Sequence, residues 1–460
     1  MWRRLVSGLL AAALGACNPA PDRGATVLYA SGADLQSINP LLTIHPLARQ
    51  VQRYVLLTTL ARYDSTLEPR PYLARGWTWS PDRRTLTFDL TSGVRWHDGV
   101  PTTARDVGWT LDAARDPVVG YPRLSDLADL ATVATPDDST VVLHFQAAQP
   151  RFPDVLTDLA ILPAHLLDSV PRARLRGAAW NQAPVGNGPF RFVRHEPNRR
   201  WVFAANPDFP PALGGPPRLE RLVFAVVDEP VTKLAALVAG ELDVAGIQPA
   251  HAEYVRRDPR LRVLDYPVLF TYGIVFNTRR PPFDRVDLRR SVSAGLDRRE
   301  LVEGYVYGYG TPATGSAPAR SHLLPHAPIP FELLTVGSGD GVLEQMLQAQ
   351  LARAGFRVAL RQLELSAFLD RLYGPAHDFD AAVLGIPGDL GLGYLGPLAG
   401  VAGMAAPRDP VEAERLFADS VPVAFLYHAR GVQGLTRRVQ GVRMDIRGEL
   451  ATVHDWWVTR

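Results

Sequence analysis

Residues 333–363 contain the pattern that most limits the possible folds of this chain. Residues 333–336 form a short apolar run typical of a buried strand, and residues 357–363 are strand-like again. Between them lies a helical segment that ends at Gly355 and carries four apolar side chains on one face: Leu343, Met346, Leu347 and Leu351. A strand, a helix and a strand in this order form a βαβ unit with two parallel strands. The pattern therefore predicts an α/β protein.

Strands and helices alternate along much of the remaining sequence. Strand-like runs cover residues 26–30, 86–90 and 222–227. Polar residues mark the expected starts of helices, because their side chains can accept hydrogen bonds from the first free N–H groups. The expected caps are Thr103 with Asp106 at the capping-box distance, Asp228, Asp287 and Asp297. Asp98 and Gly99 form a predicted turn.

Length and charge narrow the class of protein. The chain has 460 residues, enough for about three domains of ordinary size. It carries 49 Lys and Arg against 47 Asp and Glu, so loss of Arg3 and Arg4 with a leader would leave 47 of each. This balance argues against nucleic acid as a partner, because phosphate binding needs an excess of basic side chains. Lys233 is the only lysine, and we interpret this scarcity of lysine as a bias of genomic composition that carries no functional weight.

The single cysteine, Cys17, follows a short basic stretch and ten apolar residues, 5–14. As a helix these ten would rise about 15 Å, half of the roughly 30 Å that a membrane core requires. The pattern resembles a bacterial lipoprotein signal peptide, which implies removal of residues 1–16 and acylation of Cys17 as a membrane anchor. Residues 17–25 would then be a tether. The alternative is a plain secretory leader with an incidental cysteine.

A series of short motifs appears in a characteristic order between residues 30 and 457. The motifs are residues 39–40, 71–74, 94–99 with 104–107, 184–190, 206–209, 240–243, 276–278, 281–283 with 287–292, and 308–313. In this order they resemble family 5 of the extracellular solute-binding proteins, the peptide-binding lipoproteins of ABC importers. Asn187 stands where we expect a threonine in that family.

The resemblance implies a two-lobed periplasmic-binding-protein-like fold of the large cluster C type. Lobe I would be discontinuous, with residues 26–50, 160–265 and 425–460, and residues 51–159 would form an inserted subdomain. Lobe II would cover residues 266–424, and hinge strands near residues 263–275 and 418–428 would join the lobes. Closure of the lobes on a ligand would be the functional step.

The resemblance also implies a set of ligand contacts. Main-chain hydrogen bonds to strand edges would hold a peptide, and a carboxylate would pair with its α-ammonium group. We expect Asp389 in that role, with Asp34 second, although Ile386 stands where peptide-binding members have an aromatic residue. The other expected lining residues are residues 29–35 including Leu35, then Asn187, Gly188, Phe270, Thr271, Tyr272 and Gly388.

The segment after Asp389 departs from the family pattern. Residues 390–406 contain five glycines and no charged residue, where the family usually has a longer polar stretch and a helix. We expect lobe II to be shortened here, with either a buried loop or a mobile apolar cover over the cleft.

No enzyme signature stands out in the sequence. There is no phosphate-binding G-x-x-x-x-G-K-[ST] loop, so the ATPase must be another chain, and His195-Glu196 lacks the second histidine of a zinc protease. We expect no enzyme, no cofactor and no metal. The predicted function is a monomeric, extracytoplasmic, membrane-anchored protein that delivers peptides or a related solute to an ABC permease. The alternative is a lipoprotein receptor or assembly factor that has lost ligand binding.

Overall fold

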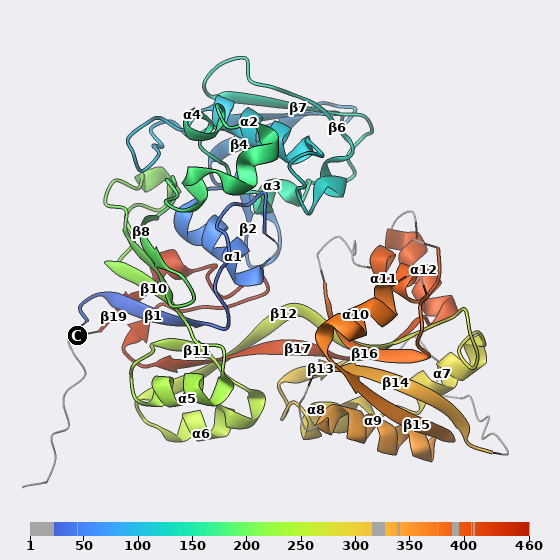
Figure 1. Ribbon diagram of the computed structural model, residues 1–460. Coiled ribbons are helices and arrows are strands. Elements are labelled where there is room, and N and C mark those ends of the chain that lie inside the picture. The colour runs from blue at the N-terminus through green and yellow to red at the C-terminus, as the bar shows by residue number, and fades with distance from the viewer. Residues whose placement is uncertain are drawn as a thin grey trace, which may run out of the picture.

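The computed structural model describes residues 23–43, 45–314, 327–337, 341–374, 376–388, 395–405, 407 and 410–459. The described residues form two α/β lobes and a further block of strands and helices above lobe I (Figure 1). One sheet of eleven strands within these ranges extends through both lobes. Its path is β15–β14–β16–β12–β17–β11–β1–β10–β9–β8, and β13 pairs with β17 beside it.

Lobe I contains the half of this sheet that includes the first strand. Its strands are β1 (Thr26–Ser31), β8 (Phe190–Glu196), β9 (Arg200–Ala205), β10 (Arg221–Val226) and β11 (Val244–Gly246). β1 pairs in parallel with β10 on one side and with β11 on the other. Helices α5 (Pro230–Val238) and α6 (Ala252–Arg257) cover one face, where Leu237 and Val255 are fully buried. The parallel strands therefore end at a common edge.

Lobe II is a sheet covered by helices on both faces. Its strands are β13 (Gly310–Pro312), β14 (Ile329–Val336), β15 (Phe356–Leu363) and β16 (Ala381–Pro387). One face carries α7 (Val286–Ala294), α8 (Arg298–Gly304) and α9 (Val342–Arg353), and the other carries α10 (Leu365–Tyr373), α11 (Leu395–Val401) and α12 (Pro410–Ser420). The two apolar clusters of this lobe contain described residues between 272 and 429 only, so each belongs wholly to lobe II.

Two long strands connect the lobes. β12 (Leu261–Phe276) and β17 (Val423–Thr436) are antiparallel and run side by side from lobe I into lobe II (Figure 1). Their register shifts between Pro267 and Thr271 and again between Tyr272 and Gly273. We call β12 and β17 the crossing strands. The predicted first hinge range matches β12, but the second was placed too early, since residues 418–420 belong to α12 in lobe II.

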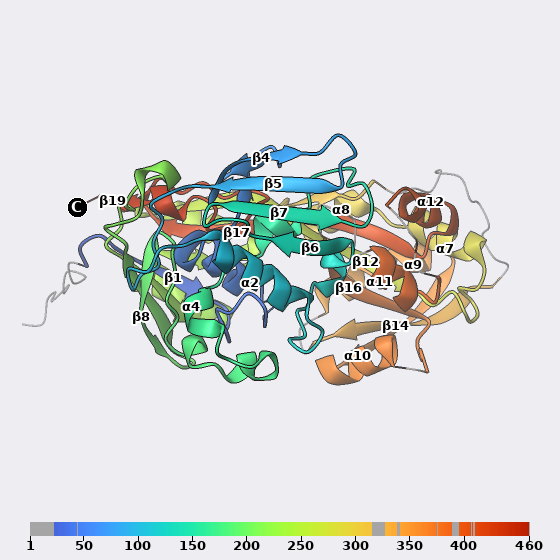
Figure 2. The same cartoon turned by 90° about the horizontal axis from the view of Figure 1, so that it is seen from above.

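The inserted subdomain is built around a four-stranded antiparallel sheet. Figure 2 shows β4 (Ala74–Trp79), β5 (Thr85–Leu90), β7 (Thr140–Phe145) and β6 (Leu130–Ala134) side by side, with α2 (Ala104–Arg115) next to them. Its smaller elements are β2 (Ala61–Tyr63), β3 (Pro69–Pro71), η2 (Leu124–Leu127) and α3 (Val155–Asp158). Helix α4 (Ala164–Leu167) follows the predicted end at residue 159 but still contacts the subdomain, since the N–H of Ala164 donates to Asp106 at 2.8 Å. The predicted boundary at residue 51 falls where α1 (Pro46–Val51) continues into the π-helix η1 (Gln52–Leu56). One apolar cluster joins this subdomain to lobe I, so the two share a core.

The remaining short elements lie in or beside lobe I. They are the 3₁₀-helices η3 (Arg172–Gly177), η4 (Ala179–Asn181), η5 (Pro211–Leu213), η6 (Pro249–His251) and η7 (Val453–Asp455), and the strands β18 (Val439–Gln440) and β19 (Trp457–Val458). The end of the chain thus returns to lobe I.

A buried ion cluster fixes the subdomain to lobe I. Asp158 in α3 is 9% exposed and pairs with Arg53 at 2.6 Å, with Arg123 at 2.8 Å and with Arg49. Burial by itself raises the pKa of Asp158, but the three guanidinium groups outweigh burial and hold that pKa well below its usual range. The carboxylate therefore stays ionised, and its removal would leave buried positive charge uncompensated.

Most local predictions are confirmed. β14 and β15 are parallel and α9 joins them, as the βαβ pattern requires. The N–H of Thr103 donates to Asp106 at 2.8 Å in the expected capping box. The Asp297 side chain caps α8, and Gly99 has a φ of +91° in the predicted turn.

Three local predictions are wrong. The cap of α5 is Glu229 instead of Asp228, because Pro230 takes the first helical position, where its missing N–H costs nothing. Asp287 lies inside α7, whose cap is Arg285. Residues 395–401, expected in a loop or mobile cover, form helix α11, and Leu398 and Val401 pack in the apolar cluster of lobe II.

Candidate functional site

On the lobe I side, the crossing strands meet β1 in a cluster of hydrogen-bonded polar side chains. The hydroxyl of Tyr266 donates to Oε1 of Glu449 at 2.8 Å, and the hydroxyl of Tyr29 donates to Oε2 of the same carboxylate. Nε2 of Gln433 donates to the two hydroxyl oxygens, at 3.4 Å and 3.5 Å. Burial raises the pKa of both tyrosines, so both hydroxyls stay protonated as donors. We call these four residues the polar cluster.

On the lobe II side, the same strands carry stacked aromatic rings. The ring of Tyr272 stacks on Tyr427 with the centroids 5.0 Å apart, and Phe270 lies edge-on to Tyr272 at 5.5 Å. Gly385 in β16 has no side chain, which leaves room for the ring of Phe270. The N–H of Gly388 donates to the carbonyl of Leu269 at 2.9 Å. The structure therefore brings three predicted contacts together: Phe270, Tyr272 and Gly388.

Between these two groups, polar pairs bridge the crossing strands. Arg430 Nε donates to Asp265 Oδ2 at 2.8 Å, and Thr271 Oγ1 lies 2.8 Å from Nδ1 of His428. Burial lowers the pKa of His428, which favours its neutral form at pH 7. The two pairs lie on either side of the first register shift. A change in the angle between the lobes would therefore alter the distances within these pairs.

Asp34 is engaged within lobe I. Its carboxylate accepts hydrogen bonds from Trp201 Nε1 at 2.8 Å, from the N–H of Asn198 at 2.7 Å and from His195 Nε2 at 3.0 Å. Burial alone would raise the pKa of Asp34, but these donors lower it to about 2. Leu35 beside it is fully buried. Asp34 thus fixes the loop after β1 to the β8–β9 hairpin, and its role as a receptor for an ammonium group stays a prediction.

Asn187 and Gly188 lie at the junction of lobe I and the inserted subdomain. Asn187 is fully buried, accepts from the N–H of Thr58 at 2.9 Å and donates to Thr102 Oγ1 at 3.3 Å. The N–H of Gly188 donates to the carbonyl of Leu56 at 2.8 Å, so close that a side chain would overlap that backbone. These contacts are internal, and among the described residues no hydrogen bond links them to Asp34 or Phe270.

Two predicted site residues, Cys17 and Asp389, lie outside the described residues. The polar cluster was missed apart from Tyr29. Its members come from β1, β12, β17 and the segment before η7, and only the register of these strands brings them together. The aromatic residues from Tyr266 to Tyr272, followed by Gly273, indicated that this segment could belong to the site. No feature of the sequence near Glu449 indicates that it takes part.

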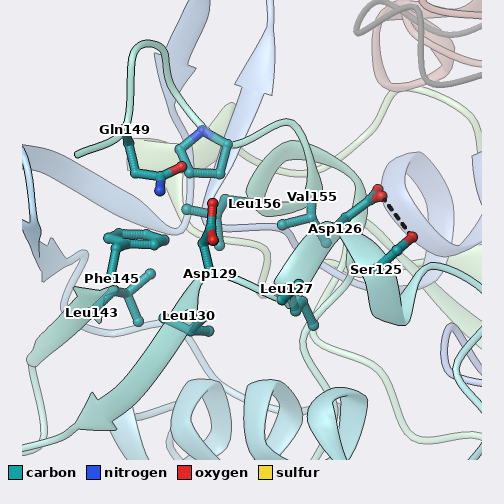
Figure 3. A pocket seen from close by; sticks show the side chains of 12 residues that line it. Ser125, Asp126, Leu127, Asp129, Leu130, Leu143, Phe145, Gln149, Val155 and Leu156 are labelled. Atoms are coloured by element: carbon teal, nitrogen blue, oxygen red, sulfur yellow. Dashed lines mark hydrogen bonds between the residues drawn. The ribbon is translucent and has the colours of Figure 1, made fainter. Parts of the chain in front are cut away.

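The described cavities lie away from the crossing strands. A cavity of about 120 Å³ lies in the inserted subdomain between η2, β6 and β7, with the carboxylate of Asp129 and the ring of Phe145 at its wall (Figure 3). No group of three or more His, Cys, Asp or Glu side chains within the described ranges could hold a metal ion. Nor is any helix of these ranges both long and apolar enough to cross a membrane.

Comparison with known proteins identifies the family. The model of the bacterial extracellular solute-binding proteins, family 5 Middle, matches residues 68–332. A putative ABC transporter peptide-binding protein of Brucella ovis is 31% identical over 55% of this chain, and the match spans 48% of that relative, about half its length. The di/tripeptide-binding protein 4 of Pseudomonas aeruginosa is 30% identical over 72% of this chain and 70% of its own length.

A solved structure supports the fold. An ABC transporter substrate-binding protein from Listeria monocytogenes aligns with a TM-score of 0.81 over 95% of this chain and 99% of its own, at 19% identity. The two-lobed fold predicted from the motifs is thereby confirmed. With the family model covering more than half of its residues, the chain belongs to family 5 of the bacterial extracellular solute-binding proteins.

Proposed function

We propose that this chain captures short peptides by closure of its two lobes and delivers them to the permease and ATPase of an ABC importer. The names of the relatives support this proposal, since those from Brucella and Pseudomonas are named for peptide binding. The protein acts as a monomeric binding component without catalysis. Its ligand is held between the polar cluster of lobe I and the aromatic rings of lobe II.

The observation that carries the proposal is the pair of crossing strands. β12 and β17 pair within each lobe, but their pairing is interrupted between Pro267 and Thr271, and their register shifts there and again at Tyr272 and Gly273. Each such irregularity bends and twists the strands locally. Among the described residues, the apolar clusters of lobe II contain only residues between 272 and 429, so β17 belongs to lobe II as far as Ala429 and not only to residue 424 as predicted. Outside the crossing strands, the lobe II residue that packs in a cluster of lobe I is Tyr309. A rotation about the strands therefore disturbs little packed surface.

Peptide binding can be tested with the leaderless protein in a thermal unfolding assay. A ligand at 100 times its Kd stabilises the folded state by about 2.7 kcal/mol, which raises the melting temperature measurably. We expect stabilisation by di- and tripeptides. Unchanged melting with every peptide of two to nine residues, combined with no small molecule in native mass spectra, would instead favour the receptor or assembly factor.

The carboxylate of Asp389 is our candidate partner for the peptide α-ammonium group. A charge-assisted hydrogen bond of this kind is worth roughly 1.5–3 kcal/mol, or about ten- to a hundredfold in affinity. Asp389→Asn should weaken a free-amine peptide and leave its N-acetylated form almost unchanged. Equal effects on the two peptides would assign the ammonium group to another residue. Our proposal also includes a lobe II that is shortened after Asp389, and this predicts that short apolar peptides bind better than long charged ones.

The membrane anchor is a separate part of the proposal. Cys17, at the end of an apolar leader, would be acylated and would hold the protein at an extracytoplasmic membrane surface. Cys17→Ser should move the protein from the membrane fraction to the soluble fraction without changing peptide binding. A variant that stays with the membrane would contradict lipid anchoring.

A further inference from the structure

The ammonium group of Lys233 has no hydrogen-bond or ion-pair partner in the part of the chain that the structure describes. Lys233 lies in the first turn of α5 and is half-buried. Its Nζ therefore faces the surroundings of α5 without a direct polar contact to a described residue. Burial lowers its pKa, because the charged form has lost part of its water. A partly dehydrated cation with three free donors is an incomplete contact.

The position of Lys233 points to the space beside the crossing strands. β1, β10 and β11 run parallel, so their carboxyl ends share one edge. The chain from β10 through α5 to β11 passes across β1, which lies between those two strands. In open α/β sheets, ligands bind outside the carboxyl ends at such a change of direction. A methyl group placed on Gly32, the residue after β1, would lie 3.7 Å from Nζ of Lys233.

The backbone next to Lys233 is also available. Gly32 is exposed, and beyond the end of β1 its N–H and C=O make no backbone hydrogen bond within the described part of the chain. The neighbouring Ser31 carbonyl is already used, since it accepts from the N–H of Val227 at 2.8 Å. Free main-chain groups at the end of a strand can pair with an extended peptide. Gly32 and Lys233 thus offer main-chain hydrogen bonds and a positive charge at one place.

Two carboxylates lie near Lys233 without contacting it. Burial is the larger influence and lowers the pKa of Lys233, while the negative charges of Asp228 and Glu449 oppose that shift. Glu449 is already occupied by the hydroxyls of Tyr29 and Tyr266. Lys233 therefore lies near negative charge, while within the described ranges its Nζ has no hydrogen-bond acceptor.

From this juxtaposition we propose that Lys233 binds the carboxylate of the ligand, while the main chain of Gly32 pairs with the adjacent peptide unit. This assignment rests on the proposed function and adds to it the end of the peptide that lobe I recognises. Charge-assisted hydrogen bonds from the ammonium group predict a preference of about tenfold or more for a free carboxylate over an amide. The carboxylate is either the C-terminus or an acidic side chain.

Isothermal titration with trialanine and trialanine amide tests this assignment, since only the first has a free C-terminal carboxylate. We expect wild-type protein to prefer the acid by about tenfold or more, Lys233→Met to lose the preference, and Lys233→Arg to keep most of it. An unchanged ratio in Lys233→Met would overturn the proposal. A peptide amide that contains one glutamate tests whether the bound carboxylate comes from a side chain. It should bind more tightly than trialanine amide only if Lys233 binds an acidic side chain.

Arg257→Met is the matched control. Arg257 lies on α6, pairs with Glu253 at 3.3 Å and is 77% exposed, so its loss changes the net charge equally. We expect this variant to keep the wild-type ratio of acid to amide affinity. A comparable fall in that ratio would assign the effect to net charge and contradict a contact at Lys233.

A second probe separates this inference from the proposed function. Because the chain has one lysine, reductive methylation with ¹³C-formaldehyde labels only Nζ of Lys233 and the α-amino group. The lysine NMR signal should shift saturably with acetate and should not shift with acetamide. If the lysine signal responds to acetate but no peptide binds, peptide capture is contradicted and the assignment of Lys233 as a carboxylate site stands. Absence of an acetate response would overturn the assignment of Lys233 even if peptides bind.

Discussion

Lobe I and lobe II share the crossing strands, but the side chains around these strands differ in kind. On the lobe I side, Tyr29, Tyr266 and Gln433 are joined through Glu449 by directional hydrogen bonds. On the lobe II side, Phe270, Tyr272 and Tyr427 pack by ring contacts. Hydrogen bonds weaken steeply as their angles change, whereas ring contacts tolerate a range of tilts.

This difference suggests a division of tasks between the lobes. Lobe I holds its side of the site in one geometry and is tied to the inserted subdomain by the pair of Arg49 with Asp158. Lobe II offers surfaces that can adjust to ligands of different shape. The comparison predicts that polar substitutions disturb lobe I most and that aromatic substitutions in lobe II have milder effects on stability.

The largest effect should come from breaking the ion cluster that joins the inserted subdomain to lobe I. Asp158→Ala leaves three arginines without their shared carboxylate and should lower the free energy of unfolding by about 3–5 kcal/mol. Urea unfolding followed by tryptophan fluorescence measures the change. The control is Asp168→Ala, whose pair with Arg105 is exposed and should contribute only about 0–1 kcal/mol. Similar losses in the two variants would refute the special role of the buried cluster.

A smaller loss is expected from the polar cluster itself. Glu449→Ala removes the acceptor of two buried hydroxyls, at a cost of about 2 kcal/mol, since each unsatisfied donor costs about 1–3 kcal/mol and water can replace part of the contact. Chemical denaturation is the suitable measurement. A variant as stable as wild type would show that the hydrogen bonds to Glu449 do not fix the lobe I side of the site.

Acid should reveal the contribution of Asp34. Its pKa is about 2 in the folded protein, against about 3.9 in an unfolded chain, so its stabilising effect is complete above pH 4. That effect is lost as the pH falls from about 4 toward 2. Asp34→Asn should therefore differ from wild type by about 1 kcal/mol at pH 6, with the difference shrinking at low pH. A difference independent of pH would indicate a purely steric role.

The smallest effect should follow a change in the aromatic rings of lobe II. Tyr272→Leu keeps an apolar side chain but removes the stacking on Tyr427, worth about 0.5–1.5 kcal/mol. Thermal unfolding should shift slightly, while the affinity for aromatic and aliphatic dipeptides should change in different proportions. If this variant costs as much as Asp158→Ala, the contrast between the lobes is wrong.

The sequence predicted those features that depend on nearby residues. The βαβ unit, the Thr103–Asp106 capping box and the Asp297 cap each need only a few residues in the right order. The cap at Glu229 was also predictable, since Pro230 marks the first position of the helix. The order of motifs sufficed for the family and the two-lobed fold.

The missed features depend on partners far apart in the chain. Asp34 looked like a free carboxylate because its donors, His195, Asn198 and Trp201, come from a distant hairpin. The polar cluster needs Glu449, some 420 residues from Tyr29. Lys233 was dismissed on composition, and only the geometry shows its free donors beside Gly32. Charge and residue type alone do not reveal which groups are already satisfied.

The placement of the first and last strands of the large sheet also governs the order in which this protein can fold. β1 lies between β10 and β11, and the other neighbour of β11 is β17, which begins at residue 423. Lobe I therefore cannot complete its sheet until nearly the whole chain has been synthesised. Pairings of such large sequence separation slow folding, because a long loop must close before the contacts form. A ribosome-bound chain should remain protease-sensitive in lobe I until its last residues emerge.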